Sequence, residues 1–442
     1  MTDFTQGKIL RQIVFFVIPL FLGNIFQQLY NMTDSIIVGR LLGPHALAAI
    51  GATTPVIRFS IAIAVGMTLG VSVLVSQYFG AREQELVRIS IKTSYVFFLI
   101  LAAVVTAAGF IFTPSILKIL QTPPEIQDKA VSYLRITFSG TVVMVGYNVV
   151  SAIYRGIGNS KTPLFILVVF TLLNIGLDLF FVLLLKMGVE GTALATVVCQ
   201  AGAFITSYFL FHRYYPELRI KGKSPVFDKT ILMKCLKIGL PSGLKGALYW
   251  GGYMFITAVV NGYGALTIAA FAAASRLDSL VQTPLQSFGF GLSSFVGQNV
   301  GANNPARIKS GIRVCVSCGI ITAMAITIIV YFWAVPIMGL FTKDRDVIRI
   351  GAEYLRIASV FYIIYALQEV IQGLAIGCGN TLLLMISTIT AMWVVRVPLV
   401  FLMSSRFGIE GIWYSIPVGW FVAMIFTNSY YLSGKWKKKL PG

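Results

Sequence analysis

The sequence contains few charged residues and very few acidic ones. Of its 442 residues, 12% are charged and 57% are hydrophobic, whereas soluble domains have about 25% charged residues. Only 16 residues are Asp or Glu, against 35 Lys or Arg, so the formal charge is +19. The apolar residues lie in long runs without polar alternation, which argues against a membrane β-barrel and favours membrane-spanning helices. We expect the basic excess to face anionic lipid, and we expect no nucleic-acid partner.

Residues that bind transition metals or carry out catalysis are also scarce. The chain has 2 His and 5 Cys. Cys315 and Cys318 lie in an apolar run without further His or Cys nearby, so helix packing explains this pair better than zinc or redox chemistry. No phosphate-binding loop, HExxH motif or Ser/His/Asp set is evident. We therefore expect no enzyme activity, no catalytic residue and no cofactor.

The apolar residues form twelve hydrophobic segments, each long enough to cross a bilayer. The sequence therefore predicts an all-α integral membrane protein with twelve transmembrane helices. The segments cover about 13–39, 47–79, 92–114, 130–156, 162–186, 190–212, 232–261, 265–299, 312–340, 350–377, 381–404 and 411–433.

The two halves of the chain repeat the same turn and kink residues. An offset of 220 to 222 positions relates four pairs of short motifs. The motif pairs are Ile18-Pro19 with Leu240-Pro241, Gln77–Ala81 with Gln298–Ala302, Gly156–Asn159 with Gly377–Asn380, and Gly188–Gly191 with Gly408–Gly411. A six-helix repeat is parallel, with its axis along the membrane normal.

The repeat predicts two pseudo-symmetric six-helix bundles. The N-terminal lobe is expected at 1–212, a basic cytoplasmic linker at 213–231, and the C-terminal lobe with a basic tail at 232–442. Lys and Arg are concentrated in the breaks on the side of the two termini, so both termini are expected in the cytoplasm.

Two acids lie within apolar segments of the first half at positions where the second half has no acid. Asp34 corresponds to Ile256 in the second half, and Asp178 corresponds to Pro398. A carboxylate in a membrane helix costs about 2.5–3.5 kcal/mol on insertion scales, so these acids indicate a functional site. The alternative is that they only form hydrogen bonds between helices.

Oxygen-bearing side chains accompany Asp178. Asn174 precedes it by four residues and shares its helix face, and Thr192 and Thr196 lie one turn apart in the next segment. Carboxylate, amide and hydroxyl oxygens suit a hard cation such as Na⁺. The same carboxylates could hold a proton instead, because burial favours the neutral acid.

Aromatic and helix-bending residues accompany the acids. Tyr30, Tyr133 and Tyr147 could line a cavity and attract organic cations through their ring faces, although packing is an equal alternative. Pro19 removes a backbone donor from the first helix and is expected to let it bend.

The second half has its own polar residues. Lys245 and Glu369 could form an ion pair between helices, and Arg276 could pair locally with Asp278. These groups, with Arg396, could be functional or structural.

Four motifs give the chain a resemblance to a known family. They are NMTDSIIVG at 31–39, RGIGN at 155–159, Asn174-x-x-x-Asp178, and GVEGTALAT at 188–196. With its two six-helix halves, the chain resembles the multidrug and toxic compound extrusion (MATE) transporters over nearly its whole length, and within them the prokaryotic DinF-like branch.

The resemblance implies a V-shaped pair of bundles that exports organic cations and amphipathic drugs in exchange for Na⁺ or H⁺. It implies an ion or proton site made by Asp34, Asn174, Asp178 and Thr196, with Pro19 as the bend that responds to it. It also implies that Tyr30 and Tyr133 line the cavity. The expected setting is a monomer in the plasma (inner) membrane of a prokaryote.

Other functions remain open. A flippase for a lipid-linked saccharide, within the same architecture, would use cationic groups such as Arg276, Arg396 and Lys245 to hold a diphosphate. A channel is disfavoured because the internal repeat suits two rocking halves.

Overall fold

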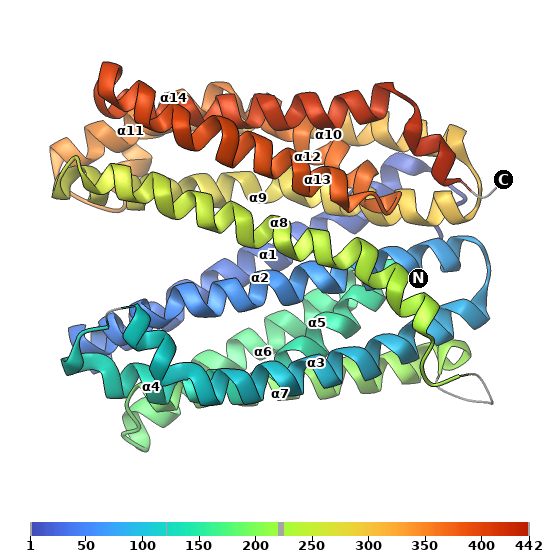
Figure 1. Cartoon of the computed structure of the whole chain (residues 1–442), viewed down its shortest axis with the longest axis horizontal. Helices are drawn as coiled ribbons and strands as arrows, with labels where there is room; N and C mark the ends of the chain where they lie inside the picture. The colour runs from blue at the N-terminus through green and yellow to red at the C-terminus, as the bar shows by residue number, and fades with distance from the viewer. Residues whose placement is uncertain (1, 121, 220–224, 441–442) are drawn as a thin grey trace. The chain divides into compact units, whose positions relative to one another are not determined.

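The computed structural model describes residues 2–120, 122–219 and 225–440, and over these residues the regular structure is helical, without strands (Figure 1). The predicted all-α class is confirmed. The chain forms two compact units. Unit 1 comprises Met1–Thr2 and Leu22–Gly239, and unit 2 comprises Asp3–Phe21 and Leu240–Gly442. The lobe boundaries expected from the sequence repeat, 1–212 and 232–442, stay a prediction.

Unit 1 contains most of the helices of the first half. Its helices run largely along the long direction of the picture (Figure 1). They are the end of α1 (Ile9–Ile37), η1 (Val38–Leu42), α2 (Pro44–Gly80), α3 (Gln84–Ile119), α4 (Pro124–Ser139), α5 (Thr141–Gly156), α6 (Lys161–Leu179), η2 (Phe180–Leu184), α7 (Val189–Tyr214), η3 (Pro216–Leu218) and the start of α8 (Lys229–Asn261).

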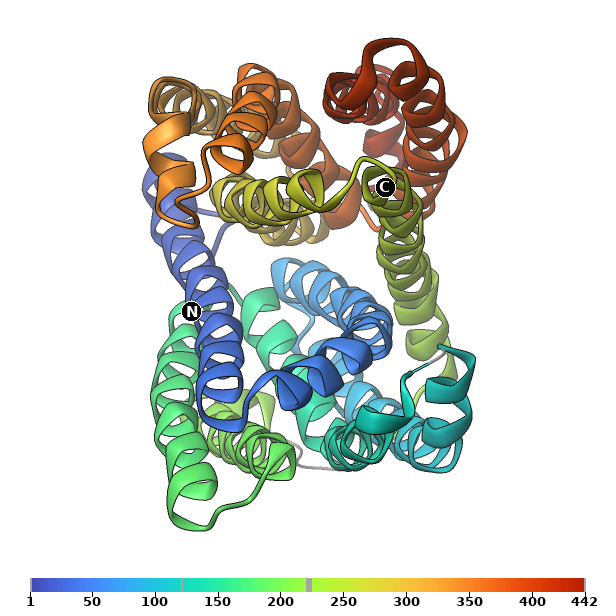
Figure 2. The ribbon, with the colours of Figure 1, turned by 90° about the vertical axis from the view of Figure 1, so that its left-hand side faces the viewer.

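Unit 2 contains the start of α1, the remainder of α8 and the helices that follow. Several of its helices are seen almost end-on in Figure 2. The helices after α8 are α9 (Ala265–Gly301), α10 (Pro305–Gly339), α11 (Arg345–Val360), α12 (Tyr362–Gly377), α13 (Thr381–Thr388), η4 (Ile389–Arg396), α14 (Val397–Leu432) and η5 (Lys435–Lys439).

Length and composition identify the helices that can cross a membrane. In the described part of the chain there are seven, or up to nine if the pairs α4–α5 and α11–α12, bent by 45° and 54°, each count as one span. The span Thr381–Leu432 is interrupted at Gly408, where the backbone leaves the helical region. Dividing it there and adding α8 and α9, which are long but are not among these apolar spans, gives twelve helical segments at the predicted places.

The internal repeat is visible in the backbone. Residues with left-handed φ, which only Gly adopts easily, recur in pairs at the sequence offset. The pairs are Gly43 with Gly264, Arg82 with Asn303, Gly158 with Gly379, and Lys186 with Gly408. Because each pair ends or begins equivalent helices, the two halves share one set of turns. The duplication read from the sequence is therefore a duplication of structure.

Unit 2 has a core rich in aromatic side chains. The rings of Phe271 and Trp413 stack with centroids 5.6 Å apart, and Tyr354 meets Trp413 edge-on at 5.0 Å. These three rings join the buried apolar residues of α8, α9, α11, α12 and α14. Offset and edge-to-face pairs of this kind add about 0.5–1.5 kcal/mol each to the burial of their area.

Two glycines let α9 and α12 approach closely. A side chain at Gly373 would meet the backbone of Gly289, and one at Gly289 would meet the carbonyl of Glu369. Small residues allow such close backbone contact between membrane helices. The contact fixes the position of the polar residues that α12 carries.

The N-terminal segment is anchored in unit 2. Phe4 is fully buried between Phe16 and Phe295. The Phe4 N–H donates to the Gln298 side chain at 2.8 Å. The Arg307 guanidinium donates to the carbonyls of Phe4 and Gln6 at 2.6 and 2.7 Å.

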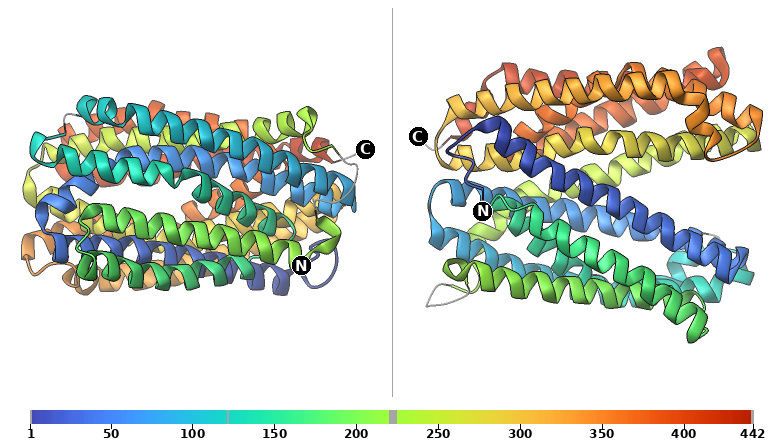
Figure 3. Two further views of the ribbon diagram at one scale, coloured as in Figure 1. Left: turned by 90° about the horizontal axis from the view of Figure 1, so that it is seen from below. Right: turned by 180° about the vertical axis from the view of Figure 1, so that it is seen from behind.

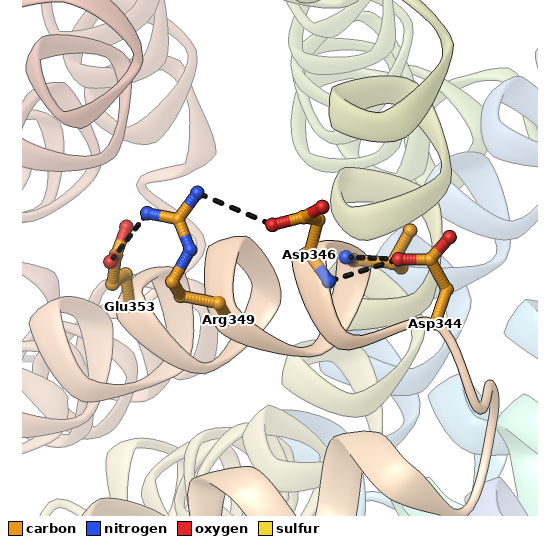
Figure 4. A network of polar contacts seen from close by, with 5 residues as sticks. Asp344, Asp346, Arg349 and Glu353 are labelled. Carbon is orange, nitrogen blue, oxygen red and sulfur yellow. Dashed lines mark hydrogen bonds and ion pairs between the residues drawn. The ribbon is translucent and has the colours of Figure 1, made fainter.

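Helix α11 begins at an N-cap on the surface (Figure 4). The Asp344 carboxylate accepts from the backbone N–H groups of Asp346 and Val347 at 2.9 and 3.1 Å. Arg349 pairs with Asp346 at 3.7 Å and with Glu353 at 3.9 Å. Capping stabilises a helix by about 1 kcal/mol, whereas exposed ion pairs contribute little.

Candidate ion and substrate site in unit 1

Helix α6 buries an amide and a carboxyl group on one face. Asn174 and Asp178 are four residues apart, and their side chains are 1% and 0% exposed. Helix α7 runs beside α6 (Figure 3), so the polar face of α6 meets Thr196. The sequence predicted this face from the i, i+4 spacing.

Hydrogen bonds connect α6, α7 and α1. With its amide oriented to satisfy both neighbours, Asn174 donates to Asp178 Oδ2 at 3.1 Å and accepts from the Thr196 N–H at 3.3 Å. The Tyr30 hydroxyl and the Thr196 hydroxyl lie 2.8 Å apart. Three helices therefore share one polar network.

Asp34 belongs to the same neighbourhood. It lies one helical turn after Tyr30 on α1, it is half-buried, and its carboxyl group interacts electrostatically with that of Asp178. Among the described residues, Asp34 Oδ1 and Asp178 Oδ1 have no hydrogen-bond partner. A buried polar atom without a partner costs about 1–3 kcal/mol. A proton or a cation would satisfy both oxygens.

A pocket opens beside this network. It contains about 540 Å³ of space free of atoms, open solvent included. Helices α1, α5, α6 and α7 line it with neutral polar and apolar side chains: Gln27, Tyr30, Tyr147, Asn148, Leu167, Phe170, Thr171, Asn174, Thr196, Cys199, Gln200 and Ala203.

The three predicted cavity tyrosines take different places. Tyr30 and Tyr147 line the pocket, and the Tyr147 hydroxyl donates to the Pro163 carbonyl at 3.2 Å. Tyr133 is 9% exposed and packs with Val38 and other apolar residues away from the lining. It still lies within electrostatic range of Asp34 and Asp178.

The sequence analysis did not single out three polar residues of the lining, Gln27, Asn148 and Gln200. Gln200 follows Thr196 by one turn, and Asn148 follows Tyr147 directly. One signal could have found them: each is a polar side chain inside an apolar segment, close to a residue already selected.

Thr192 and Pro19 lie apart from the network. The Thr192 hydroxyl donates to the Val189 carbonyl at 3.0 Å, within its own helix. Pro19 is inside α1, which remains helical from Ile9 to Ile37. The part of α1 up to Phe21 belongs to unit 2, and the part from Leu22 onward, just after this proline, belongs to unit 1.

In unit 2, a glutamine links the predicted Lys245 and Glu369 pair. The Lys245 ammonium donates to the Gln372 side-chain oxygen, and the Gln372 amide donates to Glu369 Oε1 at 3.1 Å. The two charges also attract each other. The sequence analysis did not include Gln372, which lies one turn after Glu369 on α12.

The local pairing of Arg276 with Asp278 is wrong. Arg276 is exposed, whereas Asp278 is 6% exposed. Asp278 accepts hydrogen bonds from Gln282 at 2.7 Å, from the Tyr362 hydroxyl at 2.8 Å and from the Tyr354 hydroxyl at 3.0 Å. Residues two apart on a helix point in different directions, so the acid turns inward and the arginine outward.

The arrangement is typical of a membrane transport protein. A duplicated helical architecture carries two acids within apolar helices beside a pocket. In the described residues there is no group of three or more His, Cys, Asp or Glu that could hold a metal ion.

Comparison with known proteins identifies the family. The family model described as MatE matches residues 19–180 and again residues 241–402. The chain therefore belongs to the MatE family, a family of transporters, and the two matches follow its internal repeat. The resemblance inferred from the four motifs is confirmed.

Individual relatives cover nearly the whole chain. The chain is 31% identical to the probable multidrug resistance protein YpnP of Bacillus subtilis, covering 98% of this chain and 97% of the relative. It is 26% identical to the probable multidrug resistance protein NorM of Thermotoga maritima, covering 98% and 94%. A solved structure described as an outward-facing conformation of a multidrug resistance MATE family transporter matches with a TM-score of 0.92, 26% identity and 98% coverage of both chains.

Proposed function

We propose that this protein is a secondary active antiporter that exports organic cations and amphipathic drugs in exchange for Na⁺ or H⁺. The observation that carries the proposal is that the pocket and the acid network share residues. Tyr30, Asn174 and Thr196 line the pocket, and the same side chains contact one another or Asp178. The names of the relatives, which refer to multidrug resistance, support a drug substrate.

The shared residues make occupancy mutually exclusive. When Asp34 and Asp178 are ionised, their negative charge attracts an organic cation in the adjacent pocket. A coupling ion or proton neutralises the pair and removes this attraction. By linkage, a drug that binds better to the charged form weakens ion binding by the same factor.

Helix α1 transmits the change. It carries Tyr30 and Asp34 after Pro19, whose ring nitrogen has no hydrogen to donate to the helix. A helix bends most easily at such a position. Neutralisation of Asp34 alters the contacts of the part of α1 that follows Pro19, and Pro19 lets that part move.

The coupling ion is Na⁺ or H⁺, because oxygen ligands with unpaired carboxylate atoms suit either. No catalytic step or cofactor is required. We further propose a monomer in the plasma (inner) membrane of a prokaryote, with both termini in the cytoplasm, as the Lys and Arg bias favours.

The test is drug efflux from proteoliposomes loaded with a fluorescent organic cation. A Na⁺ gradient and a pH gradient are imposed separately on the full-length protein, on Asp34→Asn and on Asp178→Asn. We expect at least one gradient to drive efflux by the unmodified protein. In both variants the rate of coupled drug efflux should fall at least about tenfold, because the neutral amide cannot change charge.

A matched control is Asp346→Asn, which removes an exposed carboxylate from the surface network of unit 2. It should leave efflux unchanged. Coupled efflux by both Asp34→Asn and Asp178→Asn at the unmodified rate would rule out the proposed site.

The saccharide flippase is the second candidate. It needs cationic groups free to bind a diphosphate, but Lys245 is held by Gln372 and Arg396 lies near Asp278. Transport of a lipid-linked diphosphate saccharide without drug efflux would support it.

A further inference from the structure

Unit 2 has a groove whose lining is separate from the pocket of unit 1. Helices α10, α12 and α14 form it, with α12 packed against both of the others. Its lining consists of Ile312, Arg313, Val316, Leu367, Ile371, Asn428, Tyr431 and Leu432. It contains about 740 Å³ of space free of atoms, open solvent included.

The groove lies near one end of all three helices. Ile312 is seven residues after the start of α10, and Ile371 is six residues before the end of α12, so both lie roughly 10 Å from a helix end. Leu432 is the last residue of α14. The groove is therefore at the depth where a membrane changes from acyl chains to headgroups.

One wall of the groove continues into a face that suits lipid. Along α10, Arg313 shares its helix face with Ile321, Met324, Ile328 and Phe332, which follow at intervals of three, four or eight residues. These four apolar side chains are 49–69% exposed. An exposed apolar face on a membrane helix contacts acyl chains, and a basic residue at its end meets headgroups.

Three polar side chains of the groove have open hydrogen-bonding capacity. Within residues 2–120, 122–219 and 225–440, the side chains of Arg313, Asn428 and Tyr431 form no hydrogen bond or ion pair. They supply a guanidinium, an amide and a phenol hydroxyl, which are donors that a phosphate oxygen accepts from.

The charged residues of α10 and of the end of α14 with the segment after it, which carry the polar lining, have one sign. Lys309 precedes Arg313 by one turn on α10, and Lys435, Lys437 and Lys438 follow the end of α14. Trp436 is 1% exposed and so anchors this basic segment. Helix α10 contains no acid, and neither does the sequence from 421 to 440.

We propose that this groove binds one anionic phospholipid from the membrane leaflet at this end of unit 2. The phosphate is held by Arg313, Asn428 and Tyr431, and the lysines of α10 and η5 favour its negative charge. An acyl chain lies along Ile312, Val316, Leu367 and Ile371. The site is separate from the pocket of unit 1 and does not depend on the coupling ion.

Native mass spectrometry of the full-length protein tests this site. The probes are dioleoyl phosphatidylglycerol and dioleoyl phosphatidylcholine, which differ only in the headgroup. For the first lipid bound, we expect about a fivefold preference for phosphatidylglycerol, as one basic side chain near a headgroup provides. Arg313→Gln should lower this preference, and Arg213→Gln, which removes an exposed arginine at the end of α7, should retain it.

A second variant tests the acyl part of the site. Val316→Phe fills the groove without changing charge and should reduce the binding of both lipids. Equal retention of the two lipids by the unmodified protein would overturn the proposal, as would an unchanged preference in Arg313→Gln. Displacement of phosphatidylglycerol by inorganic phosphate alone would show an anion site in place of a lipid site, and would also overturn it.

Discussion

Replacing Asp278 with alanine should destabilise unit 2 strongly. The carboxylate is buried and accepts three hydrogen bonds, from Gln282, Tyr354 and Tyr362, at 2.7 to 3.0 Å. Alanine leaves two buried tyrosine hydroxyls without their acceptor. It also removes the negative charge that attracts the buried Arg396.

The expected loss follows from the three bonds. Interhelical hydrogen bonds in membrane proteins average about 0.6 kcal/mol and reach about 1.7, and bonds to charged groups belong at the upper end. The bonds from Tyr354 and Tyr362 join different helices, and the bond from Gln282 lies within α9. Together the three bonds give a loss of about 2–5 kcal/mol in the free energy of unfolding. Asp278→Asn keeps one oxygen acceptor, so its loss should be about half as large.

The cysteines of unit 2 provide the assay. Cys315 and Cys378 are 0% and 3% exposed, so a thiol-reactive fluorophore labels them only when this unit opens. In a background where the other cysteines, Cys199, Cys235 and Cys318, are alanine, labelling across a denaturant titration reports the stability of unit 2.

Asp346→Ala is the control, because its exposed ion pair should contribute less than about 0.5 kcal/mol. The reasoning is refuted if Asp278→Ala and the control shift the labelling midpoint equally. A loss for Asp278→Asn as large as that for alanine would show that charge matters, not the number of bonds.

Four further predictions concern single side chains. Tyr30→Phe removes the hydrogen bond with Thr196 and should slow coupled efflux about two- to tenfold, the value of one hydrogen bond. Unchanged efflux would show that the pocket and the acids do not act together through this contact. Asp344→Ala removes the α11 cap and should cost about 1 kcal/mol in the unit 2 labelling assay, whereas Asp344→Asn should cost less. Gly379→Ala should cost about 1–2 kcal/mol in the same assay because φ is +73° there, and Gly319→Ala in α10, where a Cβ makes ordinary contacts, should be tolerated. Arg307→Ala should release the N-terminal segment, which limited proteolysis detects as faster cleavage before α1; Arg313→Ala should not.

Much of the fold could be predicted from local patterns. Long apolar runs specify membrane helices regardless of their neighbours. The repeat was visible because turn residues such as Gly158 and Gly379 are fixed by backbone sterics, whatever surrounds them. Asp34 and Asp178 stood out because a carboxylate in an apolar run is costly.

Partners distant in sequence could not be predicted in this way. Asp278 meets tyrosines 76 and 84 residues further along the chain, and Lys245 meets Gln372 127 residues away. Periodicity shows which face of a helix is polar, but it does not show which side chain of another helix lies opposite. For the same reason, the sequence alone does not show that Asn148 and Gln200 line the pocket, because this depends on how the helices pack.

The most direct measurement of the central claim is the affinity of the purified protein for a fluorescent organic cation, titrated against Na⁺ at fixed pH and against pH at fixed Na⁺. If the drug and the coupling ion compete for the carboxyl groups of Asp34 and Asp178, affinity falls as one of these ions increases, and Asp178→Asn shows a flat response. Affinity that is independent of both ions in the unmodified protein, or an unchanged ion dependence in Asp178→Asn, would contradict the account.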